Sequence, residues 1–226
     1  MLHNFNVKAT LTATALLMPL LGNAQLVAAA SQSRSVIDLA VTNQARSVED
    51  RERDASSRPS DVLSFIGIES GMAVLDMNAA TGYYTELLSY AVGPTGHVIA
   101  HNHSAATKLL DAKALQRRYA NNRLANVEQL FARHNDIHLP ANSLDAVLMS
   151  MVYHDTYWYD AKVDWGPVDQ HALLLDLFAA LKPGGIVGVV DHYAKAGSDP
   201  YASAMAVHRI RSGNRQTRFH SGRLRA

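Results

Sequence analysis

Five short runs with strand character, the central ones apolar on both faces, alternate with segments of helical character and constrain the fold of this chain more than any other feature. The runs lie at residues 71–77, 97–102, 126–132, 142–153 and 186–193. Runs of this length that are apolar on both faces are typical of buried parallel strands. The chain therefore has the alternation expected of an α/β protein.

The segments between these runs have the spacing and the end signals of helices. They are predicted at residues 81–92, 104–122 and 168–185. The first is stopped by "GPTG", and the last ends at Pro183 and Gly184. We expect a doubly wound, mostly parallel sheet with helices on both faces. Ligands of such sheets bind beyond the carboxyl ends of the strands, so the residues after each strand are the candidates for a site.

Composition limits the remaining choices. The chain has 226 residues, of which 48% are hydrophobic, so one α/β domain with short extensions fits its length. Its formal net charge of +1 gives no argument for a nucleic-acid partner. The absence of cysteine excludes disulfides, thiolate zinc sites and a cysteine nucleophile. The oligomeric state is left open.

Residues 1–24 have the pattern of a signal peptide. Lys8 precedes an apolar stretch, residues 9–22, and small residues at Gly22 and Ala24 allow cleavage before Gln25. We expect a periplasmic or secreted protein without a stable membrane span after cleavage. The alternative is an uncleaved interfacial helix or anchor, because Pro19 and the threonines interrupt the apolar stretch.

Three further regions follow the leader. Residues 25–60 are polar and charged and are predicted to form a helical extension, and Ser60 is a candidate N-cap for the next helix. Residues 61–200 hold the alternating pattern. Residues 201–226 form a basic tail, since no acidic residue follows Asp199. Such a tail has an alternative interpretation as a binding segment for phosphate or anionic lipid.

The order of these segments resembles the class I S-adenosylmethionine (SAM)-dependent methyltransferases. The resemblance depends on "VLDMNAATGYYTELLSYAVGPTGHVIAHN", on "NDIHLP" after the third run, on "LKPGG" before the fifth, and on the lack of a P-loop lysine. Predicted exported bacterial methyltransferases are the most similar group. The resemblance implies SAM as cofactor and a small-molecule substrate. It also implies two more strands after the fifth, which the basic tail does not provide, so an open sheet edge is expected there.

The resemblance places a cofactor turn directly after the first strand. Asp76 would hold this turn and the amino group of SAM. The family's three glycine positions are occupied by Asn78, Ala80 and Gly82, and Tyr83 follows them. Asparagine tolerates a left-handed conformation and alanine adds one methyl group, so the backbone path is expected to survive with a tighter cofactor pocket. The alternative is a turn that connects strand and helix without binding SAM.

Two later positions complete the implied cofactor site. Asn102 stands where the family has an acidic residue for the ribose hydroxyls, and an amide lacks the gain of a charged hydrogen bond. Asp136 would accept from the adenine amino group, and Ile137 would lie near the ring. The alternative for Asp136 is an Asx turn before "LPANS".

The fourth and fifth runs end in polar residues that are candidates for catalysis. His154 and Asp155 follow the fourth run, and Asp191 and His192 follow the fifth. They would act as a general base or as an orienting pair, although they could also satisfy one another structurally. The aromatic stretch 153–165 is predicted to be a wall or lid of the substrate pocket.

The residues favour a SAM-dependent methyltransferase that acts on an unknown small molecule with an aromatic or apolar portion. A non-catalytic or vestigial small-molecule-binding protein on the same fold is the alternative. A dinucleotide oxidoreductase is disfavoured, because the Gly-x-Gly-x-x-Gly spacing is missing. No specific metal site is predicted, since the HxxxH pattern of His134 and His138 lies in a loop.

Overall fold

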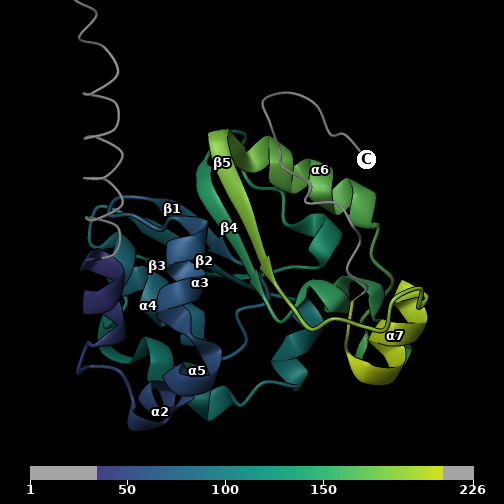
Figure 1. Cartoon of the computed structure of the whole chain (residues 1–226), viewed down its shortest axis with the longest axis horizontal. Coiled ribbons are helices and arrows are strands. Elements are labelled where there is room, and N and C mark those ends of the chain that lie inside the picture. The colour runs from purple at the N-terminus through teal and green to yellow at the C-terminus, as the bar shows by residue number, and fades with distance from the viewer. Residues whose placement is uncertain (1–34, 211–226) are drawn as a thin grey trace, which may run out of the picture.

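The computed structural model describes residues 35–210, which form a parallel sheet with helices on both faces (Figure 1). The strands pair in the order β3-β2-β1-β4-β5, and every pairing is parallel. Their bounds are β1 (Ala73–Asp76), β2 (His97–Asn102), β3 (Val127–Phe131), β4 (Leu144–Ser150) and β5 (Leu181–Val190). The predicted doubly wound fold is confirmed.

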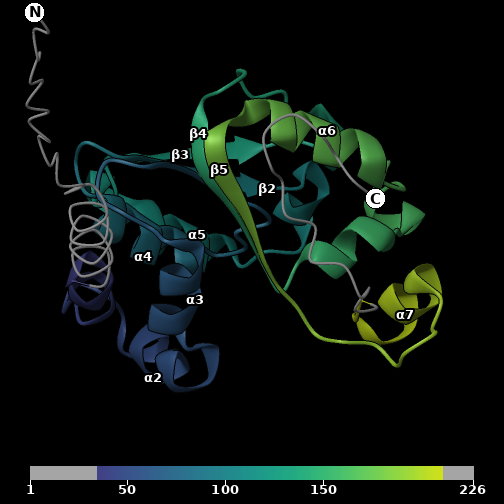
Figure 2. The same ribbon diagram turned by 45° about the horizontal axis from the view of Figure 1, so that its top comes forward.

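Alternate side chains of the central strands point to opposite faces of the sheet and build two cores. Val74, Val98 and Leu148 pack under α3 (Pro59–Ile66) and α4 (Tyr83–Val92). Leu75, Ile99 and Val147 pack on the other face, under α6 (Gln170–Ala180). Figure 2 shows α3 and α4 on one side of the sheet and α6 on the other. Because both faces are covered, the central strands need apolar residues at every position, which is the pattern read from the sequence.

The N-terminal helices lie against the first half of the domain. Residues 35–41 are helical, and α2 (Val48–Ser57) leads directly into α3. The predicted N-cap, Ser60, is wrong, because Arg58 with φ 47° occupies the capping position and Pro59 takes the first turn of α3. The predicted leader, residues 1–24, lies outside the described residues.

The helix predicted over residues 104–122 is divided. A 3₁₀ turn, η1 (Ser104–Lys108), comes first, and α5 (Ala112–Tyr119) starts anew with Asp111 as its N-cap. The Asp111 carboxylate accepts hydrogen bonds from the amides of Lys113 and Ala114, which makes it a helix start within the predicted helix. Five short 3₁₀ turns lie between the longer elements: η1, η2 (Ala120–Asn122), η3 (His134–Asp136), η4 (Tyr153–Tyr157) and η5 (Ala161–Val163).

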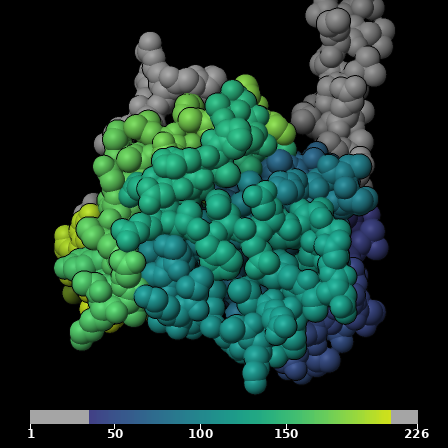
Figure 3. All heavy atoms as spheres, turned by 180° about the vertical axis from the view of Figure 1, so that it is seen from behind, coloured from purple at the N-terminus to yellow at the C-terminus, as the bar shows by residue number. Residues whose placement is uncertain are grey.

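The end of the described chain contains one more helix, α7 (Pro200–Val207), which packs against η4. The basic tail predicted from residue 201 thus begins inside a folded helix, and residues 211–226 lie outside the described part. Within residues 35–210, β5 is an edge strand with Ile186 and Val189 exposed. From behind, α7 and the N-terminal helices occupy opposite edges of the molecule (Figure 3).

Among the helices of residues 35–210, none combines the length and the apolar character that a bilayer crossing requires.

Candidate functional site

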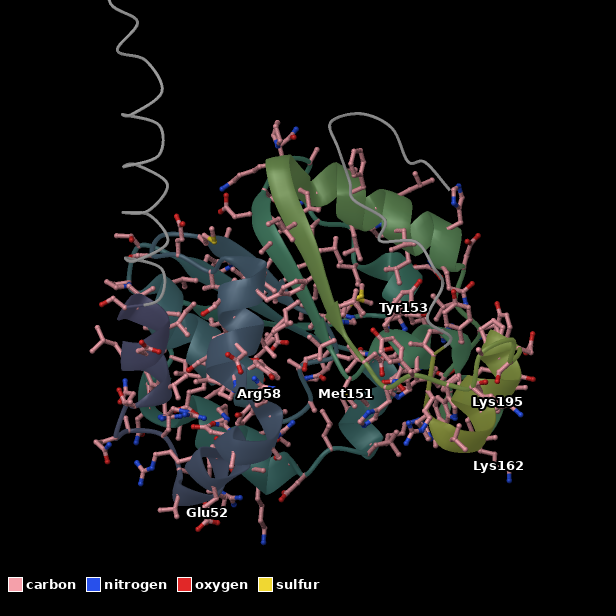
Figure 4. All side chains as sticks on the ribbon, in the orientation of Figure 1. Glu52, Arg58, Met151, Tyr153, Lys162 and Lys195 are labelled. Carbon is pink, nitrogen blue, oxygen red and sulfur yellow. The ribbon has the colours of Figure 1, made fainter. Side chains whose placement is uncertain are left out.

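The candidate site lies at the carboxyl ends of the strands, where some of the predicted residues meet and others point away. Strand β1 has β2 on one side and β4 on the other, so the chain reverses its direction of sheet growth there. Such a switch point is where open α/β sheets bind ligands. The turn after β1 lies on this rim, and Figure 4 shows Met151 and Tyr153 on the same rim, just beyond the end of β4.

The turn after β1 has left-handed backbone at the three positions where the sequence analysis placed the glycines of the family. Asn78, Ala80 and Gly82 have φ values of 51°, 52° and 86°, so all three adopt the left-handed conformation. This conformation strains a residue with a Cβ, by about 1–2 kcal/mol for alanine. The conformation that glycine adopts without strain is therefore present at all three positions.

Asn102 explains how Ala80 is held in this strained conformation. The Asn102 Oδ1 atom accepts a hydrogen bond from the Ala80 amide at 2.8 Å, and its Nδ2 donates to the Ala80 carbonyl at 3.1 Å. A carboxylate can only accept, so an aspartate at this position would face the Ala80 carbonyl without a donor. Both ends of the Asn102 amide are engaged by the turn, whereas the sequence assigned this side chain to the ribose of SAM.

Asp76 lies beneath the turn, where it is almost completely shielded from solvent. Burial raises the pKa of its carboxyl to about 7, while hydrogen bonds from Thr85 work in the opposite direction. The Thr85 hydroxyl donates to Asp76 Oδ2 at 2.6 Å from the first turn of α4. A positively charged partner would lower this pKa, because it would favour the ionised form of the carboxyl.

Gly82 and Tyr83 face protein rather than open space. A Cβ at Gly82 would lie 3.1 Å from Arg118 Cγ and 3.2 Å from the Tyr119 hydroxyl. The Tyr83 hydroxyl donates to Asp54 in α2 at 2.6 Å, so its side chain points to the N-terminal helices instead of a cofactor. This contact does not support the predicted role of Tyr83 in cofactor binding.

Arg118 ties three parts of the chain together beside the turn. Its Nε donates to the Thr81 carbonyl at 3.0 Å, and its guanidinium bonds Asp50 in α2 at 2.6 Å. It also pairs with Glu86, whose side chain is 1% exposed and which Arg123 contacts as well. The turn is therefore fixed from outside by α5 and by the N-terminal extension.

A group of buried histidines lies on the other side of the turn. His101 Nδ1 accepts from the Asn78 amide at 3.4 Å, while its Nε2 lies 3.0 Å from the Ala132 carbonyl. These partners assign the proton to Nε2. Burial lowers the pKa of His101 to about 4 and that of His134 to about 3, so both rings are neutral near pH 7.

Three buried polar atoms in this region have no hydrogen-bond partner among the described residues. They are Asn78 Oδ1, His134 Nδ1 and Trp165 Nε1. Asn78 Nδ2 lies 3.0 Å from His134 Nε2, so this nitrogen accepts and the proton of His134 belongs on Nδ1. The group thus offers one acceptor and two donors. Buried polar groups are nearly always bonded, which marks these atoms as candidates for contact with a polar ligand.

The aromatic stretch after β4 covers these histidines. The Trp165 ring stacks on His103 with centroids 4.1 Å apart and lies 5.5 Å from the His134 ring. Trp158 meets Trp165 edge-on at 5.4 Å and lies 6.1 Å from His208. The stretch predicted as a wall or lid therefore spans the rim from the histidine group to the ends of β4 and β5.

Asp136 and Ile137 occupy different environments. Asp136 is exposed at the end of η3, and its amide donates to the Arg133 carbonyl at 2.9 Å. Ile137 is buried in the core beneath α6. Both follow β3, as the sequence predicted, but Ile137 is occupied in packing the core.

Three of the four predicted catalytic side chains meet beyond β4 and β5. His154 Nδ1 lies 2.8 Å from Asp191 Oδ1, and His154 Nε2 lies 3.2 Å from Asp155. Burial opposes the charged form of His154, yet the hydrogen bond that His154 donates to Asp191 and the charge of Asp155 hold its pKa above the ordinary value. His192 differs, because its side chain is exposed and only its amide bonds Asp191, at 2.7 Å.

Arg118 and His208 were missed at the sequence level. Arg118 lies in a polar helix with no motif around it, and only the fold brings it to the turn. His208 follows α7 in the region predicted as tail, and its left-handed conformation (φ 50°) turns the chain back to the rim. His101, His103 and His134 belong to the repeated-histidine patterns "HNH" and "HNDIH", which were weighed only as metal ligands and from which no site was predicted.

No protein-family model matches the chain, and a search of curated proteins finds no match. Solved structures with a similar fold include a SAM-dependent methyltransferase from Aquifex aeolicus, at 25% identity and a TM-score of 0.49, which covers 67% of this chain and 73% of that one. A SAM-dependent methyltransferase from Mesorhizobium loti is 18% identical with a TM-score of 0.47, covering 62% and 56%. An arsenic(III) SAM methyltransferase from Chlamydomonas reinhardtii is 23% identical with a TM-score of 0.43, covering 57% and 40%. All three TM-scores are below 0.5, so these similarities carry no argument about the function of this chain.

Proposed function

We propose that the protein is a SAM-dependent methyltransferase that acts on a small molecule with an aromatic or apolar portion. The observation that supports it best is the turn after β1, where Asn78, Ala80 and Gly82 all keep left-handed backbone conformations. The strained Ala80 is held by both polar atoms of the Asn102 amide. Backbone strain that the surrounding structure maintains in this way is often found at binding sites, which is why we take it as support for the proposal.

The polar groups on the rim suit this cofactor. SAM carries an ammonium group, a carboxylate, ribose hydroxyls and an adenine, and it supplies an activated methyl group when bound. Asp76 is buried with a raised pKa and would gain from an ammonium partner. The unpaired atoms Asn78 Oδ1, His134 Nδ1 and Trp165 Nε1 provide an acceptor and two donors for hydroxyl or carboxylate groups.

The second half of the rim would hold the acceptor molecule. Tyr157 meets Tyr153 and Tyr201 edge-on, at 5.9 and 5.3 Å between centroids. These rings stand beside His154, which Asp191 orients through Nδ1. An aromatic wall next to a positioned imidazole suits a flat or apolar substrate that must lose a proton as it is methylated.

One observation favours the alternative, a small-molecule-binding protein without catalysis. Both polar ends of the Asn102 side chain are bonded to Ala80 and the side chain is buried, so this amide serves the turn in the position where the ribose hydroxyls were expected to bind. Binding without turnover would be consistent with a loop whose polar groups hold the fold instead of the cofactor.

Calorimetry with SAM and with its demethylated product, S-adenosylhomocysteine, tests the proposal. We expect both to bind the purified protein. Replacing Ala80 by glycine should tighten binding, because it removes a methyl group where the ligand must approach the backbone. Ala79→Gly is the matched control and should leave affinity unchanged. Absence of binding at millimolar SAM would end the methyltransferase proposal, and binding without methyl transfer to any acceptor would favour the alternative.

We also propose export of the protein, for which the support is the leader pattern of residues 1–24. N-terminal sequencing of protein from a periplasmic fraction should start at Gln25 or just after Ala30. An intact Met1 in the cytosol would contradict export.

A further inference from the structure

The rim beyond β4 and β5 contains a group of side chains that the methyl-transfer proposal does not use as a unit. His154 and Asp155 lie in η4, and His208 follows α7. One potential ligand atom from each of the three lies within 4.8 Å of the other two. From this geometry we propose a binding site for a divalent transition-metal ion, with zinc as its best fit.

The distances between the three side chains are close to those of a coordinated ion. His154 Nε2 lies 3.2 Å from Asp155 Oδ1, and His208 Nδ1 lies 3.9 Å from the same oxygen. Zinc bonds nitrogen and oxygen at about 2.0–2.2 Å, so the ligands of a tetrahedral site lie roughly 3.3 Å apart. A movement of the His208 side chain by less than the width of its ring would bring Nδ1 to the ligand spacing of such a site. Its side chain is 58% exposed and has room to move.

Asp191 supplies a second, independent observation. It bonds the far nitrogen of His154, Nδ1, and it is itself held by the amides of His154 at 2.9 Å and His192 at 2.7 Å. Metal-binding histidines nearly always donate their second ring N–H to a carboxylate or carbonyl, which orients the ring and leaves the other nitrogen free to coordinate. The Asp191–His154 pair presents Nε2 toward Asp155 in this way.

The ligand chemistry favours a particular class of ion. Two imidazoles with one carboxylate suit zinc and other late first-row ions, whereas calcium and magnesium prefer oxygen alone. With only three protein ligands, a fourth position would stay open toward the side where His208 is exposed. Sites that keep an open position bind water or a substrate atom there.

The site would also connect parts of the fold that are distant in sequence. Helix α7 packs against η4, and the described chain ends soon after His208. An ion shared by His208 and η4 would fasten α7 to the rim. Zinc at about 100 times its dissociation constant is therefore expected to raise the melting temperature by roughly 5–10 °C.

Zinc titration of protein purified without a polyhistidine tag and stripped with a chelator tests the inference. We expect one equivalent to bind, and Co²⁺ to show the visible absorption of a low-coordinate site. His208→Ala should weaken zinc binding by at least about 10-fold without unfolding the protein, because this side chain is exposed, and Asp155→Asn should do the same. Loss of the orienting partner in Asp191→Asn should cost about 10–100-fold.

His171→Ala is the matched control, since His171 is an exposed histidine on α6 and should not alter the titration. Unchanged zinc affinity in both His208→Ala and Asp155→Asn would overturn the inference, as would the absence of zinc binding by the unaltered protein. Because the titration contains no SAM, its outcome is separate from that of the methyltransferase proposal.

Discussion

Replacing Gly82 by alanine tests whether α5 packs closely against the turn after β1. Gly82 has φ 86°, so a Cβ would add about 1–2 kcal/mol of backbone strain. The new atom would lie 3.1 Å from Arg118 Cγ and 3.2 Å from the Tyr119 hydroxyl, which is closer than ordinary contact. Arg118 cannot yield freely, because Thr81 and Asp50 hold its guanidinium.

The two contributions give the expected size of the effect. Overpacking of this kind costs about 1–3 kcal/mol, so the total loss of unfolding free energy is about 2–5 kcal/mol. For a chain of this length, that lowers the melting temperature by roughly 5–15 °C. Thermal melts followed by circular dichroism, with urea unfolding as a second measure, are the assay.

Two other glycines separate strain from crowding. Gly184 has φ 87° but nothing within 4 Å of an added Cβ, so Gly184→Ala should show only the backbone cost of about 1–2 kcal/mol. Gly166 has open space and no positive φ, so Gly166→Ala should be neutral or stabilising by about 0.4–1 kcal/mol. If Gly82→Ala cost no more than Gly184→Ala, the contact of α5 with the turn would be refuted.

Three further predictions concern side chains around the same turn. Arg118→Ala should destabilise the protein by about 3–5 kcal/mol in chemical denaturation, because the buried carboxylate of Glu86 loses a partner. The control is Arg58→Ala, in an ion pair whose two side chains are 74% and 60% exposed, and it should change stability by less than about 0.5 kcal/mol. Asn102→Asp should cost about 1–3 kcal/mol because the Ala80 carbonyl loses its donor, and a loss below 0.5 kcal/mol would mean that the amide is not engaged as described. The pKa of Asp76 is about 7 in the folded protein against an ordinary 3.8, so between these values the folded state keeps a proton that the unfolded chain loses. The unfolding free energy, measured relative to that of Asp76→Asn, should therefore fall by up to about 4 kcal/mol as the pH rises from 4 to 7. Parallel pH curves for the two proteins would exclude the buried, protonated state of Asp76.

The sheet could be predicted from sequence because its central strands, β1, β2 and β4, are buried on both faces. Runs such as residues 142–153 have no polar face, and a continuous apolar run between turn signals has few other interpretations in an alternating chain. Boundaries were less certain where pairing decides them. Strand β5 begins at Leu181 instead of residue 186, because Leu181 pairs with Leu144 across an irregularity in the ladder. Likewise, Asp111 was predicted to lie inside one long helix, whereas its side chain caps the N-terminus of α5.

The candidate site was predictable only where a residue's role follows from its place after a strand. Asp76, His154 and Asp191 were found in this way, since Asp76 ends β1, Asp191 follows β5 directly, His154 lies shortly after β4, and the strand ends share one edge. The direction of a side chain is decided by tertiary packing, which explains why Tyr83 turns to Asp54 and Asn102 to Ala80. Arg118 contacts the turn across 37 residues of sequence, and no local pattern announces such a contact.

The paired bonding of Asn102 with Ala80 has a consequence for how this loop can change by mutation. The two positions are not independent. Glycine at position 80 would remove the backbone strain that the Asn102 amide offsets, so the carbonyl of residue 80 would no longer need to be held by a donor. Only then would an acid at position 102 be tolerated. The opposite order passes through a less stable protein. This loop can therefore change toward a glycine-rich one if Ala80→Gly comes first, whereas Asn102→Asp as the first step destabilises the protein. The double variant should be more stable than the sum of its two single changes implies.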